Sequence, residues 1–389
     1  MDRRKFLSLT GTFTGGSLLL PDFLYALGKN SSLATGGQCL VFIQLNGGND
    51  GLNTFVPFDD PLYAELRPKI ALSRSEVIGA NKGMAFHPAL AGLAKIQQDG
   101  NLSVLQNVGY PEPVRSHFRS QEIWQTASAS NEFLNRGWLG RYLDFQCKEH
   151  DPTAGLNIDT IYNLALRGEE PNSITVRDLS RFKSRQDQNT DVVLSGNPHL
   201  DFVRKIASSI SEGSDDIQKA LARAASSDVS FPKTNLGKNL EWISKLIKGN
   251  LNSKVYYTSL GGFDTHDNQI PIHRNRLMEV NDAVFSFYTD LKRSGQLENV
   301  TTVIFSEFGR RVRDNGRGTD HGTAAPMFII GGNNQGRVIG SNPDLADLDK
   351  GDLKHRIDFR TVYSTLLREK LEFDARKIGI SNDGLTGLF

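Results

Sequence analysis

The run CLVFIQL at residues 39–45 restricts the possible folds of this chain more than any other feature of its sequence. Seven residues without a charge, ending at the glycine-rich NGGNDG, are typical of a strand buried on both faces of a parallel sheet. Similar runs occur at residues 101–108, 254–260, 300–305 and 325–330, and helical patterns occur at 116–126, 274–293 and 358–371. Strands interspersed with helices predict an α/β fold with a largely parallel central sheet and helices on both faces.

Residues 151–250 do not follow this pattern, because they are rich in Ser, Asn and Lys. Helical periodicity is visible there only at 202–211 and 236–247. We interpret the region as a polar, partly helical insertion that packs over one edge of the sheet. A single α/β domain is therefore expected over residues 38–389.

The N-terminus carries two adjacent arginines, Arg3 and Arg4, before a glycine-diluted apolar run that ends at Pro21. Twin arginines in this position resemble a Tat export signal. The alternative is an amphipathic N-terminal helix with a chance arginine pair, but the run is shorter than the roughly 20 apolar residues that span a bilayer. We expect a signal at 1–28, a linker at 29–37, passage through the Tat translocase and a periplasmic or otherwise exported protein, with no other membrane segment. Whether the signal is cleaved stays open.

Composition excludes several classes of function. The 45 Lys and Arg residues nearly balance the 44 Asp and Glu residues, so no basic field favours nucleic acid. Two cysteines, Cys39 and Cys147, are too few for a cysteine-rich metal site, and any metal must be held by histidines and carboxylates. The segment 331–337 has the spacing of a phosphate-binding loop but lacks its lysine, and no nucleophile elbow or dinucleotide fingerprint occurs.

Metal-binding residue types stand beside five of the expected strands. Each alone could be a turn or a helix cap. Ligands bind at the carboxyl ends of strands in an open α/β sheet, and carboxylates with imidazoles suit divalent cations. Taken together, the residues at these strand ends predict a site for one or two divalent ions, Zn²⁺, Mg²⁺, Mn²⁺ or Ca²⁺. The candidate ligands are Asp50, Asp264, His266, Glu307, Asp320 and His321, and Ser116 and His117 also follow one of these strands.

Five ordered segments carry a family resemblance. They are GGNDGLNT (47–54), VGYPEPVRSHFRSQEIW (108–124), GGFDTHDNQ (261–269), SEFGRRVRDNGRGTDHG (306–322) and DFRTVYSTLL (358–367). The chain resembles the exported bacterial family known as domain of unknown function 1501, a distant relative of alkaline phosphatases and sulfatases. The resemblance implies an alkaline-phosphatase-like fold.

The wider superfamily also implies roles for individual residues. Asp50 resembles its first ligand, Ser116 its nucleophile at a helix start, and Asp264 with His266 the ligands of a later loop. Glu307, Asp320 and His321 resemble the remaining ligands. The chain departs from the pattern because Asn46 stands at the strand end, Asp264 and His266 are one residue apart, and Phe308 follows Glu307. Whether the site binds only one cation, or binds metal with an altered geometry, therefore stays open.

The expected reaction is the hydrolysis of a phosphate or sulfate monoester, either a small anionic ester or one linked to a polysaccharide. Ser116 would attack beside His117, with Arg115 and either Arg310 or Arg311 clamping the anion. For Arg311 and Arg313 we favour the alternative, that they are surface residues. Two alternatives stay open. One is a non-catalytic exported binding or assembly protein with a decayed metal site, and the other is a metal-dependent esterase or a polysaccharide lyase.

Overall fold

The computed structural model describes residues 37–147, 150–177, 179, 213–381 and 383–389. From Gly36 onward the chain forms one compact unit. The expected signal at 1–28, most of the linker at 29–37 and the helical segment at 202–211 lie outside the described residues.

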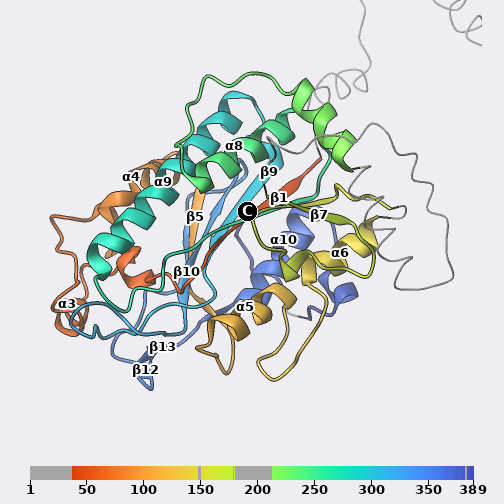
Figure 1. Cartoon of the computed structure of the whole chain (residues 1–389). Coiled ribbons are helices and arrows are strands. Elements are labelled where there is room, and N and C mark those ends of the chain that lie inside the picture. The colour runs from red at the N-terminus through yellow and green to blue at the C-terminus, as the bar shows by residue number, and fades with distance from the viewer. Residues whose placement is uncertain (1–36, 148–149, 178, 180–212, 382) are drawn as a thin grey trace, which may run out of the picture. The chain divides into compact units, whose positions relative to one another are not determined.

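A nine-stranded sheet runs through this unit (Figure 1). Its order is β11-β5-β10-β9-β1-β8-β6-β7, with β14 paired to β5. All of the strand pairs except the two made by β10 are parallel, which confirms the expected α/β class. The strands are β1 (Cys39–Leu45), β5 (Leu102–Gly109), β6 (Gly155–Ile158), β7 (Ser173–Val176), β8 (Val255–Leu260), β9 (Val300–Phe305), β10 (Ala325–Ile330), β11 (Val338–Ile339) and β14 (Ile357–Asp358).

Strand β10 runs against both of its neighbours, β5 and β9. Its first residue therefore lies at the edge of the sheet where the parallel strands end. Residues just before β10 consequently reach the same edge as residues just after β1, β8 and β9. This reversal brings the Asp320 and His321 loop to the expected ligand-binding edge.

Helices cover both faces of the sheet, with α4, α8 and α9 on one side and α5, α6 and α10 on the other (Figure 1). Alternate residues of β1 enter opposite cores: Val41 and Ile43 pack with the first group, and Leu40 and Phe42 with the second. The helices are α3 (Pro61–Leu66), α4 (Ala91–Gln98), α5 (His117–Thr126), α6 (Trp138–Gln146), α8 (Asn235–Lys248), α9 (Gln269–Arg293) and α10 (Phe359–Leu371).

Local signals explain the ends of these helices. The Thr234 side chain caps α8 by accepting from the Gly237 amide, and Asp358 caps α10 in the same way. Helix α9 begins five residues before the expected position because its Pro271 lies in the first turn, where a missing amide costs no helical hydrogen bond.

The region at 151–250 differs from the expected insertion. It contributes β6 and β7, which extend the sheet beyond β8 in parallel register, and α8, which packs on one face. Both strands are four residues long. Because they continue the sheet beyond β8, they form its edge rather than a cover over it.

Two small sheets complete the unit: β2 (Phe55–Val56) with β4 (Met84–Phe86) and β3 (Ile78–Asn81), and β12 (Leu348–Asp349) with β13 (Asp352–Leu353). Cys39 and Cys147 are free thiols. Among the described residues, no helix has the length and apolar character needed to cross a membrane.

Candidate metal centre

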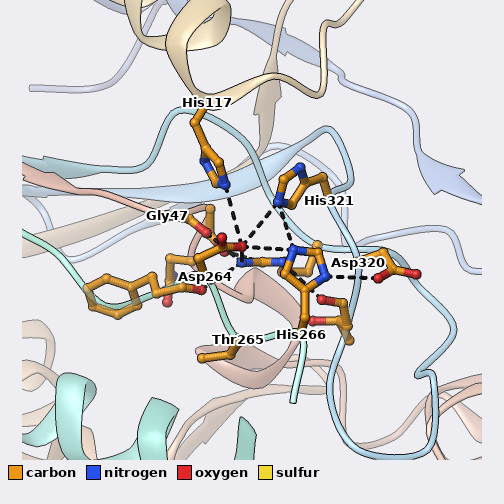
Figure 2. A network of polar contacts seen from close by, with 12 residues as sticks. Gly47, His117, Asp264, Thr265, His266, Asp320 and His321 are labelled. Atoms are coloured by element: carbon orange, nitrogen blue, oxygen red, sulfur yellow. Dashed lines mark hydrogen bonds and ion pairs between the residues drawn. The ribbon is translucent and has the colours of Figure 1, made fainter.

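Three imidazole rings turn toward one carboxylate at the carboxyl edge of the sheet (Figure 2). The Nε2 atoms of His117, His266 and His321 lie 3.4, 3.0 and 3.1 Å from Asp264 Oδ1. The Nε2 atoms of His266 and His321 are 3.0 Å apart. Ligand atoms of His117, Asp264 and His321 all lie within 4.8 Å of one another.

The four side chains come from three parts of the chain. His117 is the first residue of α5, which follows β5. Asp264 and His266 lie in the loop between β8 and α9, and His321 stands in the loop before the antiparallel β10. The sequence predicts Asp264, His266 and His321 as ligands, and the structure brings these three together.

Each imidazole is held from behind through its Nδ1 atom. His117 Nδ1 lies 2.8 Å from Glu307 Oε1, His266 Nδ1 lies 2.9 Å from Asp320 Oδ1, and His321 Nδ1 lies 2.8 Å from the carbonyl oxygen of Arg115. Carboxylate and carbonyl oxygens accept hydrogen bonds, so each Nδ1 carries the proton and donates it. In the neutral rings, Nε2 then presents a lone pair toward Asp264.

Lone pairs that face a carboxylate oxygen at these distances repel one another unless positive charge lies between them. One proton can pair only one of the three nitrogen atoms with Asp264. Donors that bind a tetrahedral zinc ion at about 2.0–2.1 Å lie about 3.4 Å from each other. The observed separations of 3.0–3.4 Å therefore suit a metal-sized cation, and the donor types suit it as well.

Arg310 fixes the carboxylate of Asp264. Its Nη2 shares its two hydrogens among Asp264 Oδ1 at 2.6 Å and the carbonyl oxygens of Gly47 and Phe263, while Nε donates to the Gly48 carbonyl and Nη1 to the Thr319 carbonyl. Partial burial alone would raise the pKa of Asp264, but the hydrogen bond from Arg310 and the charge of Arg310 lower it to about 2. Asp264 is therefore ionised. The sequence predicts Arg310 as an anion clamp, but its guanidinium bonds to acceptors within the protein.

The turn after β1 approaches the site closely. Gly47 has φ +118°, and a side chain there would place a Cβ atom 2.5 Å from the Asp264 backbone nitrogen. Gly48 has φ +71°, with no room against the Phe308 ring. Only glycine fits both positions.

Glu307, which the sequence also predicts as a ligand, stands behind His117. Its side chain is fully buried and accepts from His117 Nδ1 and from the Gly47 amide at 2.9 Å. This hydrogen bond raises the pKa of His117, against the opposing effect of partial burial. Phe308 supplies an apolar wall, with its ring centroid 4.8 Å from that of His117 and 5.0 Å from that of His321. Asp320 supports His266 in the way that Glu307 supports His117.

Asp50 does not join these groups. Its side chain is buried, and Oδ2 accepts from Arg67 Nη1 at 2.7 Å and from Gln269 Nε2. Burial alone would raise the pKa of Asp50, but the charge of Arg67 and its hydrogen bond lower it. The expected first ligand is therefore part of a buried ion pair. Sequence reasoning missed Arg67 and Gln269, because nothing in the local pattern marks either as buried.

The remaining predicted residues lie at the start of α5. The guanidinium of Arg115 pairs with the buried Asp352 instead of facing the site, and only its carbonyl oxygen contacts a site residue, His321. Ser116 is the exposed N-cap residue of α5, but its side chain makes no capping hydrogen bond. Its hydroxyl is therefore not engaged in holding the helix.

The sequence predicts His117 as a catalytic residue beside Ser116 and not as a candidate ligand. Its position could have marked it as a candidate ligand, because His117 follows a predicted strand in the same way as the candidate ligands do. The segments DTH at 264–266 and TDH at 319–321 share a further feature, a threonine next to the Asp and His residues. Both threonines, Thr265 and Thr319, are buried.

Comparison with known proteins identifies a family. A family model described as "Protein of unknown function (DUF1501)" matches residues 102–385. This match spans four of the five motifs and confirms the resemblance found in the sequence. No curated protein matches the chain in sequence.

Solved structures that resemble the chain include the PsFucS1 sulfatase from Pseudoalteromonas sp., with 11% identity, 93% of this chain and 73% of that chain covered, and a TM-score of 0.42. A protein of the alkaline phosphatase superfamily from Vibrio parahaemolyticus shows 11% identity, 79% and 63% coverage, and a TM-score of 0.37. The zinc complex of the C-terminal periplasmic domain of EcEptC from Escherichia coli shows 10% identity, 77% and 74% coverage, and a TM-score of 0.37. Likenesses of this size carry no conclusion about activity.

Proposed function

The chain belongs to the family of proteins of unknown function DUF1501, and from the geometry of its site we propose that it is an exported, metal-dependent hydrolase of phosphate or sulfate monoesters. One observation carries the proposal: three imidazole Nε2 atoms, each with its Nδ1 atom bound from behind, converge on the ionised Asp264. Histidines oriented in this way by carboxylates and carbonyls are typical of metal ligands.

His117, His321 and Asp264 would hold the cation, with His266 as a further ligand. Imidazole nitrogen favours zinc and similar transition ions over Mg²⁺ and Ca²⁺, which prefer oxygen ligands. Asp264, Glu307 and Asp320 with Arg310 give the site a net charge of minus two, which one divalent cation balances. When bound, such an ion supplies a Lewis acid that stabilises negative charge on the ester oxygens.

The chain's own residues would orient the ester and attack it. Ser116 supplies a hydroxyl at the start of α5, next to the ligand His117 and unused in capping. His266 is the most exposed of the three imidazoles, with 44% of its side chain accessible, and Asp320 holds its Nδ1. It is therefore placed to face the leaving group of a substrate that arrives from solvent.

Anion binding at this site would depend on the cation. Arg115 and Arg310 are bound to protein acceptors, so neither is free to offer a charge to the ester. The carboxylates would repel an anion from the metal-free site. We therefore expect a substrate small enough, or flexible enough at its ester group, to reach the metal centre, whether free or linked to a polysaccharide.

Export is the remaining part of the proposal and rests on the twin arginines at Arg3 and Arg4. Passage through the Tat translocase in the folded state would let the metal enter in the cytoplasm.

A non-catalytic metal-binding protein is the second candidate. The Nε2 atoms of three histidines lie within 3.4 Å of Asp264 Oδ1, so four protein donors are available. Four protein ligands are typical of a closed structural zinc site, whereas catalytic sites keep a position open. This candidate predicts tight metal binding without turnover.

The test is hydrolysis of p-nitrophenyl phosphate and p-nitrophenyl sulfate by the full chain, metal-free and after loading with Zn²⁺. We expect turnover of at least one ester only in the loaded protein, and its loss in Ser116→Ala. Ser130→Ala is the matched control, because Ser130 is a half-buried serine in the loop after α5 and its hydroxyl donates to the Pro111 carbonyl. Loaded wild-type protein that binds metal but hydrolyses neither ester favours the non-catalytic candidate.

A further inference from the structure

A buried amide joins the two loops that supply most of the candidate ligands. Gln269, the first residue of α9, is 1% exposed. Its Oε1 accepts from the Thr265 hydroxyl at 3.2 Å and from the Thr319 hydroxyl at 2.7 Å. Thr265 stands between Asp264 and His266 in the chain, and Thr319 directly precedes Asp320 and His321.

The other end of this amide is anchored. Gln269 Nε2 donates to Asp50 Oδ2, which also accepts from Arg67. Arg67 is fully buried and donates to the backbone carbonyls of Arg311 and Val312. The donors and acceptors around Gln269 fix the orientation of its amide, because a flipped amide would point its oxygen at a carboxylate.

Other contacts join the same two loops, including the 2.9 Å contact between His266 Nδ1 and Asp320 Oδ1 and two backbone hydrogen bonds. The Thr319 amide donates to the Thr265 carbonyl at 3.2 Å, and the Gln269 amide donates to the Arg317 carbonyl at 3.0 Å. Among the described residues, the side chain of Gln269 is the one that hydrogen-bonds to both threonine hydroxyls and to the ion pair behind them. Gln269 therefore adds, from outside the ligand set, to the contacts that set the separation between His266 and His321.

We propose that Gln269, anchored by Asp50 and Arg67, is a positioning residue that holds the Asp264–His266 loop and the His321 loop at the spacing needed to bind one metal ion. The inference rests on the proposed metal site. It gives Asp50 a role that its position after β1 does not reveal. Outer partners of metal ligands typically change metal affinity by about 10–100-fold when they are removed.

The experiment measures Zn²⁺ affinity of the full chain by competition with a chromophoric chelator, and the visible absorption spectrum after loading with Co²⁺. Gln269→Met removes all three hydrogen bonds at similar volume, and Thr319→Val removes one hydroxyl. We expect each to weaken Zn²⁺ binding by about tenfold or more and to change the Co²⁺ spectrum. Thr319→Ser keeps the hydroxyl and should restore both.

Thr258→Val is the matched control. Thr258 is as fully buried as Thr319 and pairs with a side-chain amide, that of Asn239, but it lies within β8 and contacts neither ligand loop. It should lose a similar amount of thermal stability and keep wild-type Zn²⁺ affinity and Co²⁺ spectrum. If Gln269→Met fails to fold, Thr319→Val and Thr265→Val decide the question.

The outcomes separate the inference from the function that it rests on. Wild-type affinity and spectrum in both Thr319→Val and Thr265→Val, with only a lower melting temperature, would overturn the positioning role and leave the metal site standing. A wild-type chain that binds neither Zn²⁺ nor Co²⁺ would overturn the metal site and the positioning role together.

Discussion

Replacing Arg310 with lysine should destabilise the protein strongly, because this arginine is a buried hub. Its guanidinium lies within hydrogen-bond distance of five acceptors, four carbonyl oxygens and Asp264. A lysine keeps the charge but has only three donors, so at least two of the five acceptors lose their partner. Each buried acceptor left unpaired costs about 1–3 kcal/mol.

The free energy of unfolding should therefore fall by about 2–6 kcal/mol in Arg310→Lys. The lower half of that range is the expectation, since the half-exposed Asp264 can bind water instead. Total stabilities are about 5–15 kcal/mol, so the change is large enough for urea unfolding followed by circular dichroism. The matched control is Arg317→Lys on the same loop. Its exposed ion pair with Asp267 predicts a change within about 0.5 kcal/mol.

An anion clamp would behave differently. Such a residue would contribute to the binding of phosphate by the Zn²⁺-loaded protein and little to folding. If Arg310→Lys unfolds like wild type and only its phosphate affinity falls, the buried hub is refuted and Arg310 is a clamp after all.

Four further predictions concern other parts of the chain. Ser116→Ala should change the free energy of unfolding by less than about 0.5 kcal/mol, because the Ser116 hydroxyl makes no capping bond; a loss near 1 kcal/mol in urea unfolding would contradict this. The lowered pKa of Asp264 contributes stability at pH above its unfolded value of about 3.9, and this contribution disappears as pH falls toward about 2. Acid unfolding of Asp264→Asn should thus converge with wild type over that window, and a constant offset would exclude the assignment. Cys39 is buried with its pKa raised to about 12, so a thiol reagent should label it only after denaturation; rapid labelling of the native chain would be inconsistent with this. Changing Arg3 and Arg4 to lysine should leave the protein in the cytoplasm, and unchanged export on cell fractionation would remove the Tat interpretation.

Apolar patterning predicts the main strands well because burial on both faces requires continuous apolar runs. β1, β9 and β10 appear within a residue of their expected bounds. The direction of β10 was not predictable, since buried parallel and antiparallel strands have the same pattern. β6 and β7 were missed because each has only four residues in a polar region.

The sequence predicts which types of residue form the candidate site and which strands they lie beside. Asp264 and His266 follow from topology, because carboxyl ends of parallel strands meet at one edge, whereas His321 reaches this edge because β10 is antiparallel. Which carboxylate faces the Nε2 atoms and which lies behind a ring was not predictable, since this depends on burial and on the partner behind each ring. Glu307 and Asp50 illustrate the difference: one accepts from His117, and the other pairs with Arg67, whose burial no local signal marks.

Titration of the metal-free full chain with Zn²⁺ tests the metal centre most directly, with bound metal quantified by competition with a chelator. We expect one tightly bound ion per chain, retained in Arg317→Lys and lost or greatly weakened in His117→Ala and in His321→Ala. Both of these variants leave an acceptor without its imidazole, so their folding is checked by circular dichroism in the same samples. Folded His117→Ala and His321→Ala chains that bind one ion as tightly as wild type, or a wild-type chain that binds none, would contradict the site.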